Sequence, residues 1–431
     1  MKSINVGIIG FGTVGAGVAE ALLKNGELIS KRMGFVPVLR RVADLDTTTD
    51  RGVKLPDGVL INDAKQLADD PEIDIVVELV GGTTFAKEII LRAIRNGKSI
   101  VTANKALLAT YGQELFSEAQ AHNVDIGFEA SVGGGIPCIK ALREGLVGNH
   151  VKSILGILNG TCNYILTKME NDHADFEEVL KAAQKNGYAE ANPALDVDGI
   201  DTAHKAAVLA SLAFGKFFTV KDVQTSGIRS VTITDIESAA ELGYKIKLLA
   251  IIKENDGAIQ LGVHPALVPV RSLLGNVSDV FNAVWVDADV VGKTMYYGRG
   301  AGRQATSSAV VADIVDLSLN LISGSKRRIP PFPQYDEYKG LMDDSNVMSR
   351  FYIRLQVQDK PGVLSKISGI LGSHGISLSS VTQKESSSEA VPMIMLTHIA
   401  KGTEMQKAAE EIAALDEVVE PPVLFRIEDA I

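Results

Sequence analysis

The chain has 431 residues, of which 46% are hydrophobic and 22% charged, and its formal net charge is −10. This is an ordinary globular composition with room for two or three domains. The acidic charge argues against a nucleic-acid-binding surface, and no apolar run reaches the ~18 residues of a membrane span. Two cysteines, Cys138 and Cys162, cannot make a disulfide framework or a metal cluster. We therefore expect a cytoplasmic protein with no nucleic-acid or membrane partner.

A glycine-rich motif follows a predicted strand at the N-terminus. Residues 2–9 end in an apolar run, and residues 16–29 show the apolar spacing of a helix. Between them stands the pattern G-x-G-x-x-G, made of Gly10, Phe11, Gly12, Thr13, Val14 and Gly15. Its glycines allow a tight turn, a close approach of a pyrophosphate and close packing of the helix. In this context the motif predicts binding of NAD or NADP.

The second predicted strand, residues 35–43, should end beside the adenosine ribose. It carries Arg40 and Arg41, and Asp44 and Asp46 follow. An aspartate there favours NAD by binding the ribose hydroxyl, whereas an arginine accepts the 2′-phosphate of NADP. Because the sequence offers both, we expect dual use with some preference for NADP. The alternative is that both arginines only flank the strand.

Strands and helices then alternate, which predicts a doubly wound parallel sheet. Strands are expected at residues 73–80, 99–103 and 125–129, and helices at 85–95 and 111–122. Ligands bind at the C-terminal ends of the strands in such sheets. The polar residues at these ends are Thr83, Asn104, Lys105 and Glu129. Lys105 is therefore a candidate site residue rather than a surface lysine.

A glycine-rich turn, residues 129–137, exposes several carbonyls beside the carboxylate of Glu129. Hard cations prefer oxygen ligands of this kind. The pattern alone fits a simple turn at a helix entry equally well.

The segment from Tyr188 to Lys205 gathers acidic residues before an apolar helix, residues 206–214. Asp201 and Lys205 are four residues apart, so on a helix they lie on one face. An acid cluster near one ammonium could bind a zwitterion and move a proton. The alternative is a solvated loop and an ordinary helix pair worth a few tenths of a kcal/mol.

Five segments together resemble homoserine dehydrogenases. They are residues 10–15, 104–106, 129–137, 159–166 and 188–205, and the last two are specific to that family. The resemblance covers residues 1–325 in order and spacing. It implies NAD(P)-dependent interconversion of L-homoserine and L-aspartate 4-semialdehyde in threonine, methionine and isoleucine biosynthesis. The sequence departs from the family pattern at Asn192 and at Cys162, where a threonine is common.

The resemblance implies a role for each matching residue. Lys205 would donate and accept the proton, and Lys105 would lie near the nicotinamide and the substrate. The implied substrate-binding residues are Glu190, which holds the amino group, and Asp196 and Asp201, which line the pocket. A sodium ion is implied at the Glu129 side chain and the carbonyls of Val132, Gly134 and Ile136. Gly302 belongs to a loop, residues 298–302, that returns the chain to the cofactor domain.

The C-terminal part is predicted to be a separate βαββαβ unit of ferredoxin-like type. Its strands are expected near residues 351–357, 376–383, 391–399 and 423–427, and its helices near 364–371 and 404–414. The turn from Asp359 to Leu364 resembles an ACT domain, a small amino-acid-sensing module. The resemblance implies a ligand between paired modules near Gly362, with threonine as the expected inhibitor. The alternative is a dimerisation module without a ligand.

The sequence thus predicts an α/β protein of three domains. A Rossmann-type domain is expected at residues 1–135, completed by 303–325, and an α+β substrate-binding and dimerisation domain at 136–302. A linker at 326–349 and the ACT domain at 350–431 follow, and this module is not needed to bury the catalytic core, since residues 1–325 already supply two domains. The resemblance implies a dimer or tetramer. The rival hypotheses are another semialdehyde or amino-acid oxidoreductase, and a catalytically inactive NAD(P)-binding sensor of amino acids.

Overall fold

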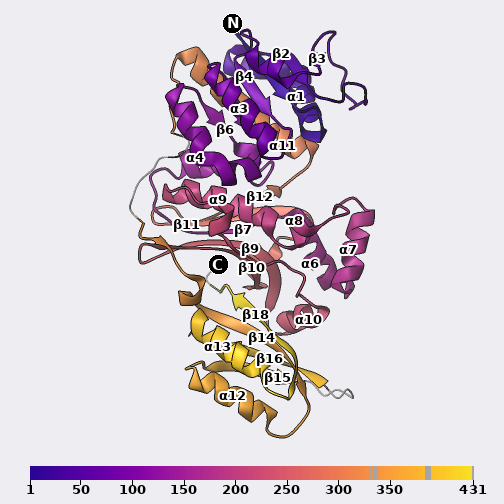
Figure 1. Cartoon of the computed structure of the whole chain (residues 1–431), viewed down its shortest axis with the longest axis vertical. Helices are drawn as coiled ribbons and strands as arrows, with labels where there is room; N and C mark the ends of the chain where they lie inside the picture. The colour runs from indigo at the N-terminus through magenta and orange to yellow at the C-terminus, as the bar shows by residue number, and fades with distance from the viewer. Residues whose placement is uncertain (331, 333–337, 384–389, 430–431) are drawn as a thin grey trace. The chain divides into compact units, whose positions relative to one another are not determined.

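The computed structural model describes residues 1–330, 332, 338–383 and 390–429, and Figure 1 labels its helices and strands. The chain folds into two compact units. One comprises Met1–Gly160, Ala203–Val223 and Phe281–Glu337, and the other comprises Thr161–Thr202, Gln224–Val280 and Tyr338–Ile431. Each unit is therefore assembled from segments that are far apart in the sequence.

A six-stranded sheet opens the first unit, in the order β3-β2-β1-β4-β5-β6. Its strands are β1 (Lys2–Ile9), β2 (Phe35–Ala43), β3 (Leu60–Ile61), β4 (Ile75–Glu78), β5 (Ser99–Thr102) and β6 (Ile126–Gly127). Every pairing is parallel. All residues of β4 and β5 are buried, as expected where helices cover both faces of a parallel sheet. The predicted Rossmann-type sheet is thereby confirmed.

The helices of this sheet are α1 (Thr13–Met33), α2 (Ala64–Asp69), α3 (Thr84–Arg95), α4 (Lys105–Ala121) and α11 (Arg303–Ser323). The helix α11 packs on α1 and on β4, β5 and β6. The two helices approach closely at Gly17, where a Cβ atom would lie 2.2 Å from Ser307 Oγ. Among the described helices, only α11 is long and apolar enough to cross a membrane, but half of that stretch is buried inside the protein. It is a core helix of the first unit.

An antiparallel ribbon of three strands completes the first unit. It consists of β7 (Val151–Ile157), β11 (Phe281–Ala288) and β12 (Gly292–Arg299), with β11 in the middle. Three short helices, η1 (Glu129–Ser131), α5 (Cys138–Lys140) and the π-helix η2 (Ala141–Gly145), connect the parallel sheet to β7. The expected strand at residues 125–129 is shorter than predicted, because the chain turns into η1 at Glu129.

The second unit is built on a long hairpin, β9 (Tyr244–Asn255) and β10 (Ala258–Pro269). Asp256 and Gly257 form its turn with positive φ angles of 50° and 81°, which is the geometry that Asp-Gly hairpins favour. Along its other edge β10 has three parallel partners: β8 (Gln224–Thr225), β13 (Gly340–Leu341) and β18 (Val418–Ile427). Its helices include α6 (Gly160–Asp172), α7 (Phe176–Lys185), α8 (Ala194–Val197) and α10 (Ile233–Glu241), and α9 (Ile200–Phe214) also begins here.

The C-terminal module has the predicted βαββαβ order. Its elements are β14 (Met348–Gln358), α12 (Val363–Ser373), β15 (Leu378–Gln383), β16 (Ala390–Thr397), α13 (Gly402–Ala413) and β18. The sheet order is β18-β14-β16-β15, and α12 and α13 lie against one face of the sheet (Figure 1). The ferredoxin-like fold is therefore confirmed.

The module is joined to the catalytic part more closely than the sequence indicated. The sheet of the module continues directly into β10, because Ala266 and Leu267 pair with Arg426 and Ile427 of β18. In addition, Lys253 on β9 forms an ion pair of 2.5 Å with Glu428, whose side chain is only 7% exposed. The module therefore covers an edge of the catalytic sheet and contributes to its burial.

Candidate active site

The glycine motif forms the turn between β1 and α1, as predicted. Gly10 has a φ of 98°, and a Cβ atom at Gly15 would lie 1.9 Å from the Gly10 carbonyl, so both positions require glycine. By contrast, nothing lies within 4 Å of the Cβ position of Gly12, which caps the N-terminus of α1. The open space and the unpaired N–H groups of a helix start are the features that receive a phosphate.

A cavity of about 500 Å³ adjoins this turn. Gly10, Gly12, Asp44 and Leu45 line one part of it, and Lys65 lines another. Asp44 is held in place because its carboxylate accepts hydrogen bonds from Phe11 N at 2.5 Å and Asp46 N at 2.9 Å. The Lys65 ammonium is paired with Glu88 at 2.9 Å. The end of β2 therefore presents a carboxylate to the cavity.

The two arginines of β2 are engaged elsewhere. Arg40 forms a salt bridge with Glu72, and Arg41 Nη1 donates to the Gly58 carbonyl at 2.9 Å. Among the described residues, neither arginine belongs to the lining of the 500 Å³ cavity. Both arginines are thus paired with groups outside the lining of this cavity.

A buried carboxylate organises the ends of β4 and β5. Glu78 is fully buried, and its oxygens accept hydrogen bonds from Thr102 Oγ1 at 2.7 Å and Val80 N at 2.9 Å. Burial raises the pKa of Glu78. Asn104 donates to the Gly82 carbonyl at 2.7 Å and caps α4 by accepting from Leu107 N. These contacts fix Lys105, the first residue of α4, at the C-terminal end of the sheet.

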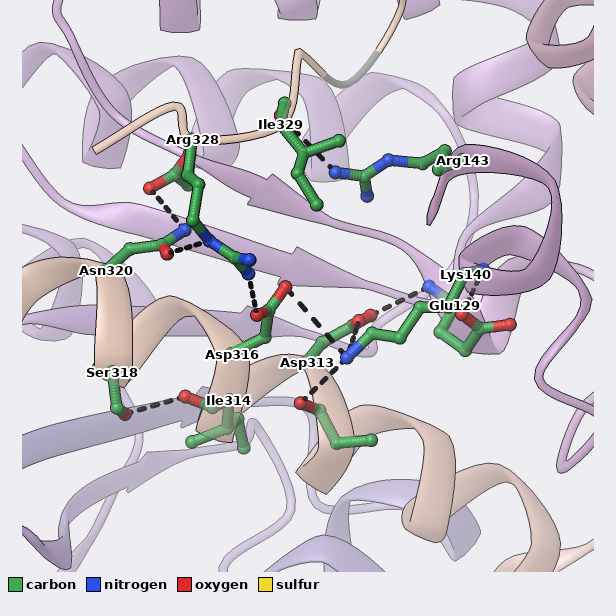
Figure 2. A network of polar contacts seen from close by, with 12 residues as sticks. Glu129, Lys140, Arg143, Asp313, Ile314, Asp316, Ser318, Asn320, Arg328 and Ile329 are labelled. Carbon is green, nitrogen blue, oxygen red and sulfur yellow. Dashed lines mark hydrogen bonds and ion pairs between the residues drawn. The ribbon is translucent and has the colours of Figure 1, made fainter. Parts of the chain in front are cut away.

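The turn after β6 is held by Glu129, which is 2% exposed. Its two carboxylate oxygens accept hydrogen bonds from Ile139 N at 2.9 Å and Lys140 N at 2.8 Å, at the start of α5. Its own N–H donates to Asp313 Oδ2 of α11 at 2.7 Å. Figure 2 shows this pair, with the Lys140 ammonium 3.8 Å from Asp313 Oδ1. The carboxylate therefore acts as an anchor for the glycine-rich turn.

The same pair of buried carboxyl groups has unusual electrostatics. Burial, with the nearby Asp313 carboxylate, raises the pKa of Glu129 to about 7. Burial likewise raises the pKa of Asp313, and the Lys140 ammonium opposes this shift. The Lys140 ammonium lies 3.8 Å from Asp313 and 4.0 Å from Asp316. Its charge opposes the rise in pKa of both Glu129 and Asp313. A cation bound at this turn would stabilise their charged forms.

Lys205 lies on α9 one turn after Asp201, as the spacing predicted. Its side chain is buried, at 8% exposure, and its ammonium donates to the Leu158 carbonyl at 2.6 Å. The Lys205 charge also opposes the rise in the pKa of the buried Cys138 thiol, which donates to the Val132 carbonyl. Lys205 therefore lies near the Glu129 turn, within the first unit.

The acidic segment belongs to the second unit. Glu190 is exposed, Asp196 is half-buried on α8, and Asp201 is 9% exposed at the first turn of α9. Thr161 Oγ1 donates to the Tyr188 carbonyl at 2.9 Å, and Cys162 Sγ donates to the Asp196 carbonyl. The backbone of the segment is thus tied to the start of α6, leaving the Glu190 carboxylate accessible to a ligand.

Comparison with known proteins identifies these features. Three family models match the chain: the homoserine dehydrogenase NAD binding domain at residues 10–129, homoserine dehydrogenase at 137–315 and the ACT domain at 351–417. The homoserine dehydrogenase of Neisseria gonorrhoeae is 43% identical over 99% of this chain and 99% of its own. The chain belongs to the homoserine dehydrogenase family.

Solved structures of homoserine dehydrogenases support the same assignment. That of Thiobacillus denitrificans matches with a TM-score of 0.94 and 44% identity, over 100% of this chain and 99% of its own. A hyperthermophilic archaeal homoserine dehydrogenase, solved in complex with NADPH, matches with a TM-score of 0.64 and 27% identity, over 74% of this chain and 98% of its own. As a homoserine dehydrogenase, the chain is an NAD(P)-dependent oxidoreductase, and its ACT domain is consistent with allosteric regulation.

Two buried carboxyl residues beside the candidate site, Glu78 and Asp313, were not predicted from the sequence. Glu78 follows an apolar run and ends a central strand, a position that could have been noticed. Asp313 lies inside the apolar helix α11, 184 residues after Glu129, so only the folded chain brings the two together. Among the described residues, no three His, Cys, Asp or Glu side chains gather as a metal site. The implied sodium ligands are instead mostly carbonyl oxygens.

Proposed function

We propose that Lys205 is the acid–base group of this homoserine dehydrogenase and that Lys105 stabilises the reacting oxygen. NAD(P), when bound, supplies the hydride acceptor for oxidation of homoserine. A neutral Lys205 amine would take the proton of the substrate hydroxyl, and its ammonium would return it in the reduction of the aldehyde. The supporting observation is the buried Lys205 side chain, whose position is fixed by its 2.6 Å hydrogen bond to the Leu158 carbonyl. Lys105 supports the proposal by its place at the end of β5.

The acidic segment would recognise the substrate as a zwitterion. The exposed Glu190 carboxylate is suited to the α-ammonium of homoserine, since charge-assisted hydrogen bonds are about twice as strong as neutral ones. Asp196 and Asp201 would line the same pocket, as the family resemblance implies. The backbone contacts of Tyr188 and Asp196 with α6 support this role by holding the segment in place.

The experiment that tests the acid–base role is turnover of L-homoserine by Lys205→Ala. We expect a fall of about 10² to 10⁴, the usual contribution of an acid–base group, with cofactor binding unchanged. Lys221→Ala, which removes an exposed lysine beyond the end of the same helix, is the matched control. Near-normal turnover by Lys205→Ala with an intact fold would exclude the proposed role.

We further propose that NAD is preferred over NADP. A carboxylate at the ribose end of the cavity can bind a 2′-hydroxyl but repels a 2′-phosphate. Asp44 lines that cavity, whereas Arg40 and Arg41 are paired elsewhere. This proposal reverses the preference for NADP that was expected from the sequence, which offers both the arginines and the aspartate.

A sodium ion at the Glu129 turn is the second proposed ligand. The donor set suits a hard cation, because it offers a carboxylate and the carbonyls of Val132, Gly134 and Ile136. These oxygens already accept hydrogen bonds in part, since Cys138 N donates to the Ile136 carbonyl, but each carbonyl has a second lone pair. The buried charge of Glu129 and Asp313 supports a cation here.

Regulation by threonine, a dimeric or tetrameric assembly and a cytoplasmic location also stay proposals. The ACT domain supports regulation by a small molecule. The Gly362 turn expected to bind the effector has a φ of 91° at the start of α12, a strained position that glycine tolerates. An inhibition assay with L-threonine on the full-length enzyme tests the effector, and light scattering tests the assembly.

A further inference from the structure

A second cavity, of about 650 Å³, lies inside the second unit. One wall comes from the catalytic part of the chain: β8 with the loop that follows it, and the middle of β10. The other wall comes from the C-terminal part of the chain. It is made of the start of α13, the end of β18 and residues at the short helix η5 (Asp344–Asn346). None of the predicted substrate or cofactor residues is among its described lining residues. This volume lies in the usual range of small-molecule sites.

The lining has the chemistry of a site for a zwitterion. Its described residues include one guanidinium residue, Arg426, and one carboxylate residue, Asp343, and the hydroxyl residues Thr225 and Ser226 belong to the same lining. A free amino acid needs this combination, because guanidinium groups pair with carboxylates and carboxylates with ammonium groups. Apolar surface for a side chain comes from buried or half-buried residues of the module: Phe351, Met405 and Leu424.

A neutral histidine lies beside the arginine. His264 precedes Ala266 by two residues on β10, and Ala266 pairs with Arg426, so both side chains emerge on one face of the sheet. Burial and the Arg426 charge lower the pKa of His264 to about 3. Its Nε2 atom is buried and has no hydrogen-bond partner among the described residues. The site thus has a single cationic side chain flanked by an uncharged imidazole.

The loop that lines this cavity is bonded directly to the acidic substrate segment. Ile228 N donates to the Val197 carbonyl at 2.8 Å, and Arg229 pairs with Asp198 at 2.5 Å. At Gly227 the two backbones are so close that a Cβ atom would lie 2.0 Å from the Val197 carbonyl. Val197 ends α8, and Asp201, in the first turn of α9, lies only four residues later. A displacement of residues 224–230 therefore displaces the substrate-binding acids.

We propose that this cavity is an effector site for a free amino acid, formed within a single chain and separate from the Gly362 turn. The proposal rests on the proposed regulation by threonine. A bound amino acid would bridge the module, through Arg426 and Asp343, to the loop at Thr225 and Ser226. Only the arrangement that keeps both walls together offers all of these contacts, so the ligand favours that arrangement. Because residues 224–230 are bonded to Val197 and Asp198, the position of the loop favoured by the ligand also fixes the position of α8.

Calorimetric titration of the full-length enzyme with L-threonine tests the site. Asp343→Asn and Asp359→Asn make a matched pair: both carboxylates are exposed, and Asp359 belongs to the turn where the family resemblance places the ligand. We expect Asp343→Asn to weaken threonine binding by roughly tenfold or more, as for the loss of a charged hydrogen bond. Asp359→Asn should bind threonine normally. The reverse pattern, or absence of threonine binding by the unaltered enzyme, would overturn the proposal.

A second measurement is independent of affinity. In hydrogen exchange, saturating L-threonine should slow exchange in residues 224–230 and 194–199 of the full-length enzyme, and Asp343→Asn should abolish this protection at the same threonine concentration. Protection confined to residues 359–364 would place the effector at the turn and exclude the cavity. Turnover of L-homoserine without threonine should be unchanged in Asp343→Asn. If the proposed dehydrogenase activity is wrong, the turnover assay without threonine fails, whereas the calorimetric and hydrogen-exchange results do not depend on that activity.

Discussion

At the scale of single residues, Glu129 should make the stability of the protein depend on pH. Its pKa rises from 4.5 in the unfolded chain to about 7 in the folded protein because the carboxyl group is buried beside Asp313. Between these values the folded state binds more protons than the unfolded state. The free energy of unfolding should therefore fall as pH rises from about 5 to 7, by an amount on the order of 2–3 kcal/mol. Urea denaturation in a sodium-free buffer measures this slope.

Sodium should oppose this loss of stability. Because a cation binds the ionised carboxylate, sodium chloride should stabilise the enzyme more at pH 8 than at pH 6, relative to tetramethylammonium chloride at equal ionic strength. In Glu129→Gln both the pH slope and the sodium effect should shrink. Equal stabilisation of Glu129→Gln and the unaltered enzyme would show that sodium does not bind at this turn.

Asp44 is expected to set the cofactor preference. Asp44→Asn removes the charge but keeps an oxygen for the Phe11 N–H group, which donates to Asp44 at 2.5 Å. We expect the ratio of kcat/KM for NADP to that for NAD to rise roughly tenfold or more, since like charges in contact are strongly unfavourable. Asp57→Asn, at an exposed position, is the control. If Arg40→Ala selectively weakens NADP use instead, Arg40 binds the 2′-phosphate of NADP, and the preference predicted from the sequence is correct.

The sequence predicted which elements carry the candidate residues, but it could not rank the side-chain partners of those residues. The spacing of Asp201 and Lys205 predicts one helix face, and α9 contains both. The choice between Asp44 and Arg40 depends on side-chain partners such as Glu72, which is 32 residues from Arg40. Periodicity carries no information about such pairs, so it could not rank the arginines against the aspartate.

At the scale of elements, the predicted strands and helices are confirmed in order, and the differences lie at their ends. The helix expected at residues 111–122 begins at Lys105, because the Asn104 side chain caps it by accepting from Leu107 N. The buried residues Leu107 and Leu108 belong to this first part of the helix, which the prediction left out. The 650 Å³ cavity was not predicted, since its walls combine short elements near residues 225, 264 and 426.

One buried link joins two elements of the second unit. Asp235, in the first turn of α10, is fully buried and accepts hydrogen bonds from Tyr352 Oη at 2.9 Å and Arg354 Nε at 2.8 Å on β14. It also completes a capping box with Thr232. Asp235→Ala should cost about 3–5 kcal/mol of stability, because it leaves the buried arginine without its partner.

Tyr352→Phe tests the contact between α10 and β14 with a smaller change. It removes only one hydrogen bond to Asp235, so we expect a loss of about 1 kcal/mol in urea denaturation. Tyr297→Phe, at a side chain that is 53% exposed, is the control and should have little effect. If Tyr352→Phe is neutral, the contact between α10 and β14 does not stabilise the unit.

At the scale of the whole molecule, the ACT module is part of the structure that it would regulate. The edge of β10 is covered by β8, β13 and β18, and two of these three strands follow residue 325. The sequence suggested a module joined only by a linker, because proline-rich segments usually separate independent domains. Residues 331 and 333–337 of that linker lie outside the described part of the chain, but Gly340 and Leu341 already pair with β10.

Truncation after Ser325 should therefore destabilise the enzyme as well as remove its regulatory module. It deletes the β18 pairing of Ala266 and Leu267 and the ion pair between Lys253 and Glu428. We expect the midpoint of thermal unfolding, followed by circular dichroism with saturating NAD, to fall by about 5 °C or more, which corresponds to a loss of about 3–4 kcal/mol in a body of this size. An unchanged midpoint would mean that the module folds and docks independently. If the midpoint does fall, loss of threonine inhibition in the truncated enzyme cannot locate the effector site, and only point variants such as Asp343→Asn can do so.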